Sequence, residues 1–134
     1  MDAGLRNALT EEHRLLDALF GRFLAAGSGG DAASAAAAIQ AFDEALRRHT
    51  GIEEQSLLTS VSAKRTAHAD ETPRERLARE LRLEHVQVRE LSGMIRRLLE
   101  ERGDLAGALR LAGNLARRWD AHTEREEREL FSAS

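Results

Sequence analysis

The composition is most informative in what it lacks. The 134-residue chain has no cysteine, which excludes disulfides, thiolate metal sites, iron–sulfur ligation and cysteine nucleophiles. It has no tyrosine, a single tryptophan, and no apolar run near the roughly 20 residues that a membrane-spanning helix needs. The first residues lack the cationic segment and long apolar stretch of a signal peptide. We therefore expect a cytoplasmic protein with no membrane partner.

The charges show no excess that would indicate a polyanionic partner. Twenty Lys and Arg residues against 23 Asp and Glu residues leave a net charge of −3, which gives no electrostatic basis for binding nucleic acid. Hydrophobic residues make up 42% of the chain, enough to build one core. The length fits a single domain over residues 1–134, which we expect to be a monomer or a weak homodimer.

Residues that end or begin helices divide the chain into four segments. The stretch GSGG at 27–30 interrupts the first part, Thr72 and Asp104 are candidate N-caps, and Gly103 is a stop signal. Pro73 suits the first position of a helix. The predicted helices run over residues 9–26, 32–60, 73–102 and 105–131, with a loop at 61–71.

Hydrophobic residues recur every three or four positions in each segment, as expected for helices that bury one face. The fold class is therefore all-α, an antiparallel up-down-up-down four-helix bundle with short loops. The predicted core residues are Leu9, Leu16, Phe20, Ile39, Phe42, Leu46, Leu57, Leu77, Leu81, Val88, Leu91 or Ser92, Ile95, Ala112, Leu115, Trp119 and Leu130.

Polar residues interrupt each of these apolar faces. Every predicted helix carries one histidine on its buried face, and two carry a glutamate four residues after it. These residues are His13, His49, Glu53, His85, His122 and Glu126. Buried imidazoles and carboxylates are costly unless they are paired or bind a metal. Either a polar network that sets the helix register or a metal site would satisfy them, and we favour the metal site.

A repeat relates the two halves of the chain. Residues 49–58, HTGIEEQSLL, match residues 122–131, HTEREERELF, and a Glu-His pair precedes each motif by 36 or 37 residues. Pairing two such helical hairpins about a pseudo-twofold axis would bring four imidazoles and two carboxylates to one level of the core. Histidine and glutamate at positions i and i+4 share a helical face, so both can reach one metal.

The donor types favour iron. Structural zinc prefers four ligands in a closed tetrahedron, and calcium or magnesium prefers mostly oxygen. Four imidazoles and two carboxylates suit two metals with two terminal imidazoles each and two bridging carboxylates. Iron is the first choice and manganese the second. The Glu-x-x-His spacing of ferritin-type bundles is absent from all four histidines.

The order His, His-x-x-x-Glu, His, His-x-x-x-Glu over nearly the whole chain resembles the hemerythrin-like, or HHE, family. The resemblance implies that His13 and His49 hold one iron and that His85 and His122 hold the other. It further implies that Glu53 and Glu126 bridge the two ions together with an oxo or hydroxo group. Oxygen-carrying members have a further histidine on the third helix. Here Leu81 and Arg89 lie four residues to either side of His85, so that ligand is missing.

Other polar and aromatic residues lie beside the motifs or outside the apolar faces. Glu12, Glu54, Glu84 and Glu127 adjoin the candidate ligands in sequence and point about 100° away from the ligand face, so we expect surface charges. Glu12 and Glu84 remain weaker candidates for orienting an imidazole. Trp119 is expected to pack around the site. His68 lies outside every apolar face and is expected to be a solvated loop residue.

A centre with one ligand fewer has more exchangeable positions, which favours irreversible chemistry with a small oxidant. The leading hypothesis is a non-haem di-iron protein that binds or reacts with O2, H2O2 or NO under oxidative or nitrosative stress. Two alternatives stay open. One is an oxygen or iron sensor that acts through a partner, and the other is a reversible carrier or store of O2 or iron. Whether the centre is catalytic is also left open by the sequence.

Overall fold

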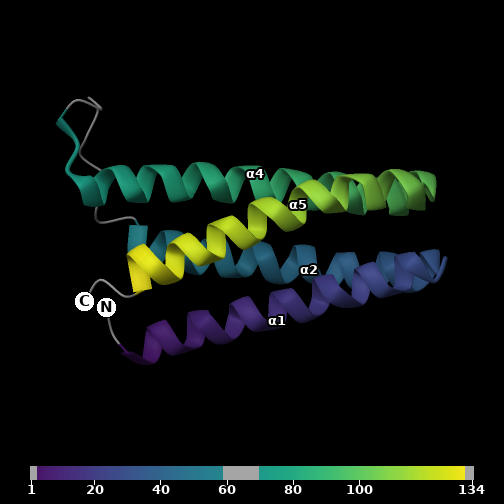
Figure 1. Ribbon diagram of the computed structural model, residues 1–134, viewed down its shortest axis with the longest axis horizontal. Coiled ribbons are helices and arrows are strands. Elements are labelled where there is room, and N and C mark those ends of the chain that lie inside the picture. The colour runs from purple at the N-terminus through teal and green to yellow at the C-terminus, as the bar shows by residue number, and fades with distance from the viewer. Residues whose placement is uncertain (1–2, 59–69, 132–134) are drawn as a thin grey trace.

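The protein is an antiparallel bundle of four long helices in up-down-up-down order (Figure 1), as predicted. The computed structural model describes residues 3–58 and 70–131, and no strand occurs among them. The long helices are α1 (Ala3–Ser28), α2 (Ala32–Glu53), α4 (Pro73–Arg102) and α5 (Leu105–Arg125). Both ends of the chain lie at one end of the bundle. No helix in the described part is long and apolar enough to cross a membrane.

Two helix ends differ from the prediction of continuous α-helix. Each motif helix changes to π-helix at its glutamate, giving η1 (Glu54–Leu58) after α2 and η3 (Glu126–Phe131) after α5. The first helix also begins at Ala3, six residues before the predicted start. The predicted loop at 61–71 lies outside the described residues except for its last two positions.

Local side-chain chemistry explains where the other helices begin and end. The hydroxyl of Thr72 accepts a bond from the Glu75 amide at 3.1 Å, and the Glu75 carboxylate accepts from the Thr72 amide at 2.9 Å. This reciprocal capping box starts α4. Gly103 ends it with a left-handed φ of +57°, and the Asp104 carboxylate caps α5. The predicted start of α4 at Thr72, its end at Gly103 and the N-cap of α5 at Asp104 are confirmed.

The core consists of two apolar clusters separated by a polar layer. The larger cluster lies toward the two hairpin turns and includes Phe20, Phe23, Phe42 and Leu115. The smaller one contains Leu9, Ala78, Leu81, Leu130 and Phe131. Full burial of a large apolar side chain contributes roughly 1.5–3 kcal/mol. Burial of the two clusters therefore offsets part of the cost of placing polar groups between them.

A second buried polar group joins α2 to α4. The carboxylate of Asp43 accepts bonds from the Ser92 hydroxyl at 2.7 Å and from Arg47 and Arg96 at 3.1 Å each. Burial raises the pKa of Asp43, but these three donors outweigh burial and hold the pKa below its usual value. Of the two core alternatives at 91 and 92, Ser92 is the buried one, because it faces this carboxylate.

Candidate metal centre

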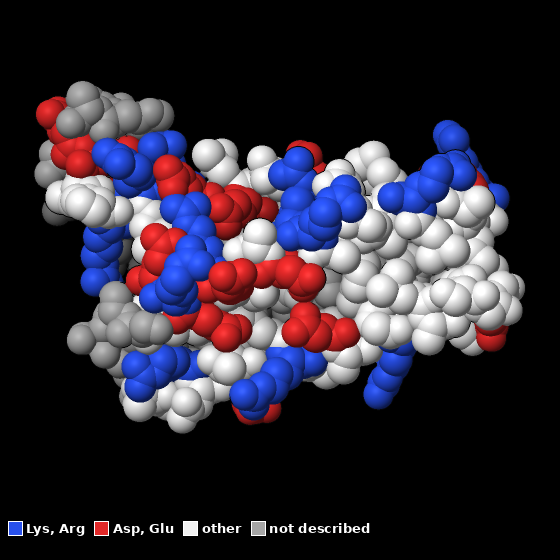
Figure 2. All heavy atoms as spheres, viewed as in Figure 1, with Lys and Arg blue, Asp and Glu red and all other residues white. Residues whose placement is uncertain are grey.

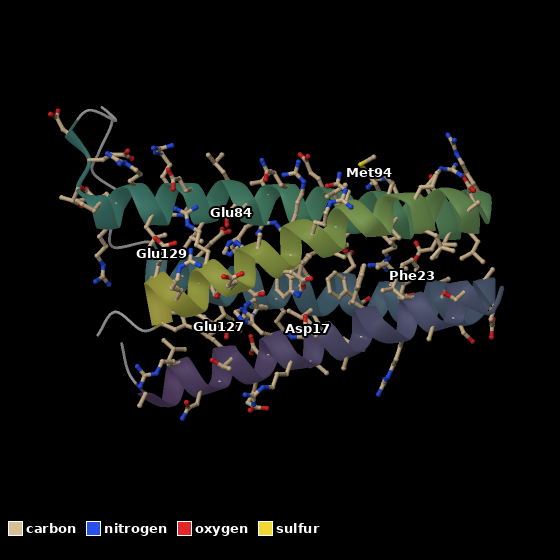
Figure 3. All side chains as sticks on the ribbon, in the orientation of Figure 1. Asp17, Phe23, Glu84, Met94, Glu127 and Glu129 are labelled. Carbon is tan, nitrogen blue, oxygen red and sulfur yellow. The ribbon has the colours of Figure 1, made fainter. Side chains whose placement is uncertain are left out.

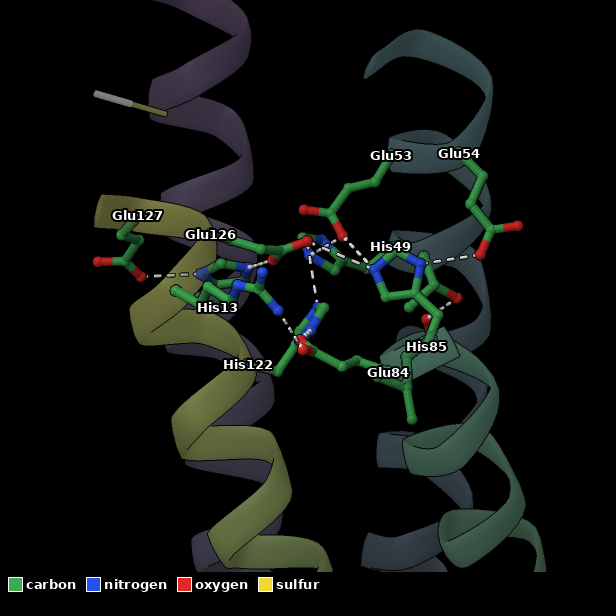
Figure 4. A network of polar contacts seen from close by, with 12 residues as sticks. His13, His49, Glu53, Glu54, Glu84, His85, His122, Glu126 and Glu127 are labelled. Atoms are coloured by element: carbon green, nitrogen blue, oxygen red, sulfur yellow. Dashed lines mark hydrogen bonds and ion pairs between the residues drawn. The ribbon is translucent and has the colours of Figure 1, made fainter. Parts of the chain in front are cut away.

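All four helices contribute to one buried polar layer (Figure 4). α1 supplies one histidine, α2 a histidine and a glutamate, α4 a histidine, α5 a histidine, and η3 begins with a glutamate. These residues are His13, His49, Glu53, His85, His122 and Glu126. None of the six is more than 3% exposed to solvent. The structure thus brings together all six residues that the sequence singled out as candidate ligands.

The six side chains form two overlapping groups of potential ligands. One contains His13 and His49, the other contains His85 and His122, and Glu53 and Glu126 belong to both. One donor atom from each member can be chosen so that all donors of a group lie within 4.8 Å of one another. Both carboxylates are therefore positioned between the two pairs of imidazoles.

The inner contacts are made by the Nε2 atoms. Glu126 lies 3.0 Å from His13 Nε2, 3.1 Å from His122 Nε2 and 3.4 Å from His85 Nε2. Glu53 Oε1 lies 3.0 Å from His85 Nε2 and 3.3 Å from His49 Nε2. All four imidazoles thus present the same nitrogen to the centre of the bundle.

Several of these inner atoms lack a hydrogen bond despite their short contacts. His49 Nε2, His122 Nε2 and both carboxylate oxygens of Glu53 are buried without a hydrogen-bond partner in the described part of the chain. An unsatisfied buried polar atom costs about 1–3 kcal/mol, and more when it is charged. Donor atoms that converge but do not satisfy one another indicate a site for a bound cation.

The outer nitrogen of every imidazole contacts a second glutamate. Glu12 lies 2.5 Å from His49 Nδ1, and Glu84 lies 2.7 Å from His122 Nδ1. Each of these two contacts joins the two helices of the same hairpin. Between hairpins, Glu54 lies 2.8 Å from His85 Nδ1 and Glu127 lies 2.8 Å from His13 Nδ1. An Nδ1–H that donates to a carboxylate orients the ring and leaves Nε2 as the coordinating atom.

The expectation that Glu54 and Glu127 are only surface charges is therefore wrong. For Glu12 and Glu84 the contacts agree with the weaker alternative, a carboxylate that orients an imidazole. All four are partly exposed, as expected from their position beside the buried face, but their carboxylates turn back to the imidazoles. The reason is the shape of the ring. When Nε2 faces the centre of the bundle, Nδ1 faces its rim. A glutamate that is next in sequence to a buried ligand lies at this rim, and its carboxylate can reach Nδ1. Figure 3 labels Glu84 and Glu127 at this level of the bundle.

Trp119 packs around the layer as predicted. Its ring centroid lies 5.6 Å from that of His13, 6.3 Å from that of His49 and 6.0 Å from that of His122, on which it stacks. Its indole N–H donates to Asp17 Oδ1 at 2.9 Å, a contact that the sequence did not indicate. The remaining histidine, His68, lies outside the described residues, so its expected solvated position stays a prediction.

Comparison with known proteins agrees with this arrangement. A profile of the hemerythrin HHE cation-binding domain matches residues 4–133. The chain belongs to this hemerythrin family. The profile describes a domain that binds cations. No curated protein and no solved structure matched the chain.

The chain departs from the oxygen-carrying hemerythrins on α4. Leu81, one turn before His85, is fully buried in the smaller apolar cluster with Leu9 and Leu130. Arg89, one turn after His85, donates to the Thr50 hydroxyl at 3.0 Å and to Glu54 at 3.3 Å. Neither side chain offers a ligand atom to the site, because one is apolar and the other is a cation.

Without a metal, the carboxylates favour protonated imidazoles. Burial alone lowers the pKa of His85, but Glu126 and Glu53 outweigh it and raise the pKa to about 10. Burial also opposes protonation of His122, and Glu126 with Glu84 raises its pKa to about 9. Burial raises the pKa of Glu126, yet the surrounding imidazoles hold it well below its usual value. A cation must therefore displace protons in order to bind.

The donor set of this hemerythrin-family chain fits iron. Four nitrogens and two shared carboxylates exceed the four ligands of structural zinc and contain too much nitrogen for calcium or magnesium. The unsatisfied inner atoms and the oriented outer nitrogens suit a metal bound by imidazole and carboxylate. The assignment of these six residues as ligands stays a prediction.

Proposed function

We propose that the protein is a non-haem di-iron protein whose centre binds and reacts with O2, H2O2 or NO. The main support is the convergence of four imidazole Nε2 atoms on two shared carboxylates, with His49, His122 and Glu53 atoms left unsatisfied. In this proposal His13 and His49 hold one ion, and His85 and His122 hold the other. Glu53 and Glu126 bridge them, and manganese is the second choice of metal.

The bound ions would supply exchangeable positions and electrons for a small oxidant. The side chains around the ions would exclude water and orient the ligands. Leu81 and its apolar cluster exclude water from one side of the layer, and Trp119 with Phe42 does so from the other. The outer glutamates hold each imidazole and keep it electron-rich. Because neither Leu81 nor Arg89 is a histidine, the centre has fewer protein ligands than an oxygen carrier, which favours reaction over reversible binding.

The metal assignment is tested by metal analysis and absorption spectroscopy of aerobically purified protein. We expect two iron ions per chain and the charge-transfer bands of a bridged centre. His49→Ala and His122→Ala each remove a donor that one ion requires, so both should lose the centre. His68→Ala is the matched control and should keep it. Full occupancy by two metals in either ligand variant, or metal-free wild-type protein, would contradict the assignment.

The reaction is tested by adding peroxide or O2 to the iron-loaded protein. Peroxide consumption or gas evolution that requires iron supports the proposal. A stable, reversible oxygenated spectrum would instead favour oxygen carriage. If the only consequence of metal binding is a large change in melting temperature, without turnover, sensing through a partner is favoured.

A further inference from the structure

We propose that Trp119 is a redox-active residue that relays single electrons to the metal centre, with Asp17 taking up the indole proton. This inference rests on the proposed di-iron function and concerns how electrons reach that centre. Trp119 is the only tryptophan, and the chain has no tyrosine. No other side chain of comparable ease of oxidation is available for such a relay.

The position of the indole is the first argument. Trp119 is 2% exposed and lies against His13 and His49 of one ligand group and against His122 of the other. It stacks on His122 with an interplanar angle of 29°. The ring is thus in contact with candidate ligands of both ions, so an electron leaving it has no gap to cross before reaching the centre.

The hydrogen bond of the indole is the second argument. Its N–H donates at 2.9 Å to Asp17, an exposed carboxylate on the face of α1 that meets α5 (Figure 3). Oxidation makes the indole N–H far more acidic than in the neutral ring, so a carboxylate already accepting that proton favours the loss of the electron. Figure 2 shows acidic side chains gathered on the half of the visible face near the chain termini. The proton therefore moves to a site that is open to solvent.

The electrons and protons balance over one cycle. When peroxide has oxidised the centre beyond its resting ferric state, Trp119 gives one electron to it and its N–H proton to Asp17, which leaves a neutral indolyl radical and a carboxylic acid. An external one-electron reductant such as ascorbate then gives one electron to the radical, and Asp17 returns the proton. The net result is transfer of one electron from the reductant to the centre.

The proton step can be measured on metal-free protein. A ruthenium photo-oxidant with a sacrificial acceptor oxidises Trp119 in a laser flash, and the transient spectrum distinguishes the neutral radical from the radical cation. In Asp17→Asn the amide still accepts the hydrogen bond but is a far weaker base, so formation of the neutral radical should slow by about tenfold or more. Asp120→Asn, a nearby exposed aspartate, is the control. An unchanged rate in Asp17→Asn would overturn the role of Asp17.

The electron step is measured on iron-loaded protein whose metal content has been determined. After peroxide has oxidised the centre beyond its resting ferric state, its reduction by ascorbate, followed by the loss of its absorption, should slow by about tenfold in Trp119→Phe and in Asp17→Asn. A residue that only packs would change stability and leave these rates alone. Because Asp17 is exposed, its variant keeps the test decisive even if Trp119→Phe folds poorly.

The two proposals fail in different ways. Normal iron content with unchanged reduction rates in both variants would overturn the relay alone. Wild-type protein that takes up no iron would overturn the di-iron function and the relay together.

Discussion

At the scale of single residues, each candidate imidazole ligand is held by its neighbours as well as by its helix. Every imidazole has a carboxylate on its outer nitrogen and faces the shared carboxylates with its inner nitrogen. Glu84 is itself fixed by Arg125 at 2.8 Å. Burial raises the pKa of Glu84, but His122 and Arg125 hold it below the usual value, so the residue stays a carboxylate. Any effect of the outer glutamates on a bound metal would thus pass through the rings.

This arrangement predicts that neutralising an outer glutamate weakens metal binding. Glu84→Gln and Glu12→Gln keep an oxygen that accepts from Nδ1 but remove the charge that keeps the imidazole electron-rich. We expect the metal affinity to fall about 10–100-fold, measured by competition with a chelator. Glu124→Gln removes an exposed carboxylate that pairs with Arg128 and should bind metal normally. Unchanged affinity in both outer variants would contradict the role of these carboxylates.

At the scale of the helices, the two motif helices change from α to π where their glutamates lie. η1 begins directly after Glu53, and η3 begins with Glu126. Such π-segments are frequent at functional sites. In both halves the widened turn carries the glutamate, Glu54 or Glu127, that reaches an imidazole of the other hairpin. The sequence repeat is thus matched by a repeat in backbone conformation.

Replacing glycine by alanine should have opposite effects on stability at Gly103 and at Gly21. Gly103 ends α4 with a positive φ, whereas Gly21 lies within α1, and an added Cβ would meet no atom within 4 Å at either position. Gly103→Ala should therefore cost about 1 kcal/mol through backbone strain alone. Gly21→Ala should stabilise by about 0.5–1 kcal/mol, because alanine is the better helix former. Urea unfolding of metal-free protein measures both, and changes of the same sign would contradict this account.

At the scale of the whole molecule, the polar layer links metal binding to folding. Its residues come from all four helices, so an unsatisfied layer weakens the bundle as a unit. The buried Asp43 network ties α2 to α4 away from the layer and does not depend on a metal. We therefore expect metal-free protein to fold, with a stability that depends on the protonation of the layer.

The direction of that pH dependence follows from the histidine pKa values. His85 and His122 have pKa values of about 10 and about 9 in the folded protein, above the ordinary value of 6.5. Their contribution is complete below about pH 6.5 and is lost as the pH rises through 9 and 10. The depressed pKa of Glu126 adds a contribution that is lost in acid.

The urea midpoint of metal-free protein should therefore fall between pH 7 and pH 10. Iron-loaded protein should show a smaller fall, because the cations take the place of the protons. A metal-free midpoint that does not change across this range would contradict the proposed charge state of the layer.

The sequence by itself determined the bundle, its caps and the six polar residues of the layer. Helical periodicity, Thr72, Gly103 and Asp104 act locally, and a histidine on an apolar face is visible in one helix at a time. The duplicated motif added the pairing of the two halves. These signals depend on spacing along the chain, which a sequence displays directly.

Only the tertiary structure decided how the layer is completed. The contacts of Glu54 with His85 and of Glu127 with His13 join different hairpins, and they depend on which edge of each ring faces inward. The bond from Trp119 to Asp17 spans 102 residues, and the burial of Asp43 depends on Ser92 and Arg96 of α4. Partners distant in sequence set these contacts, and the spacing along any one helix carries no record of them.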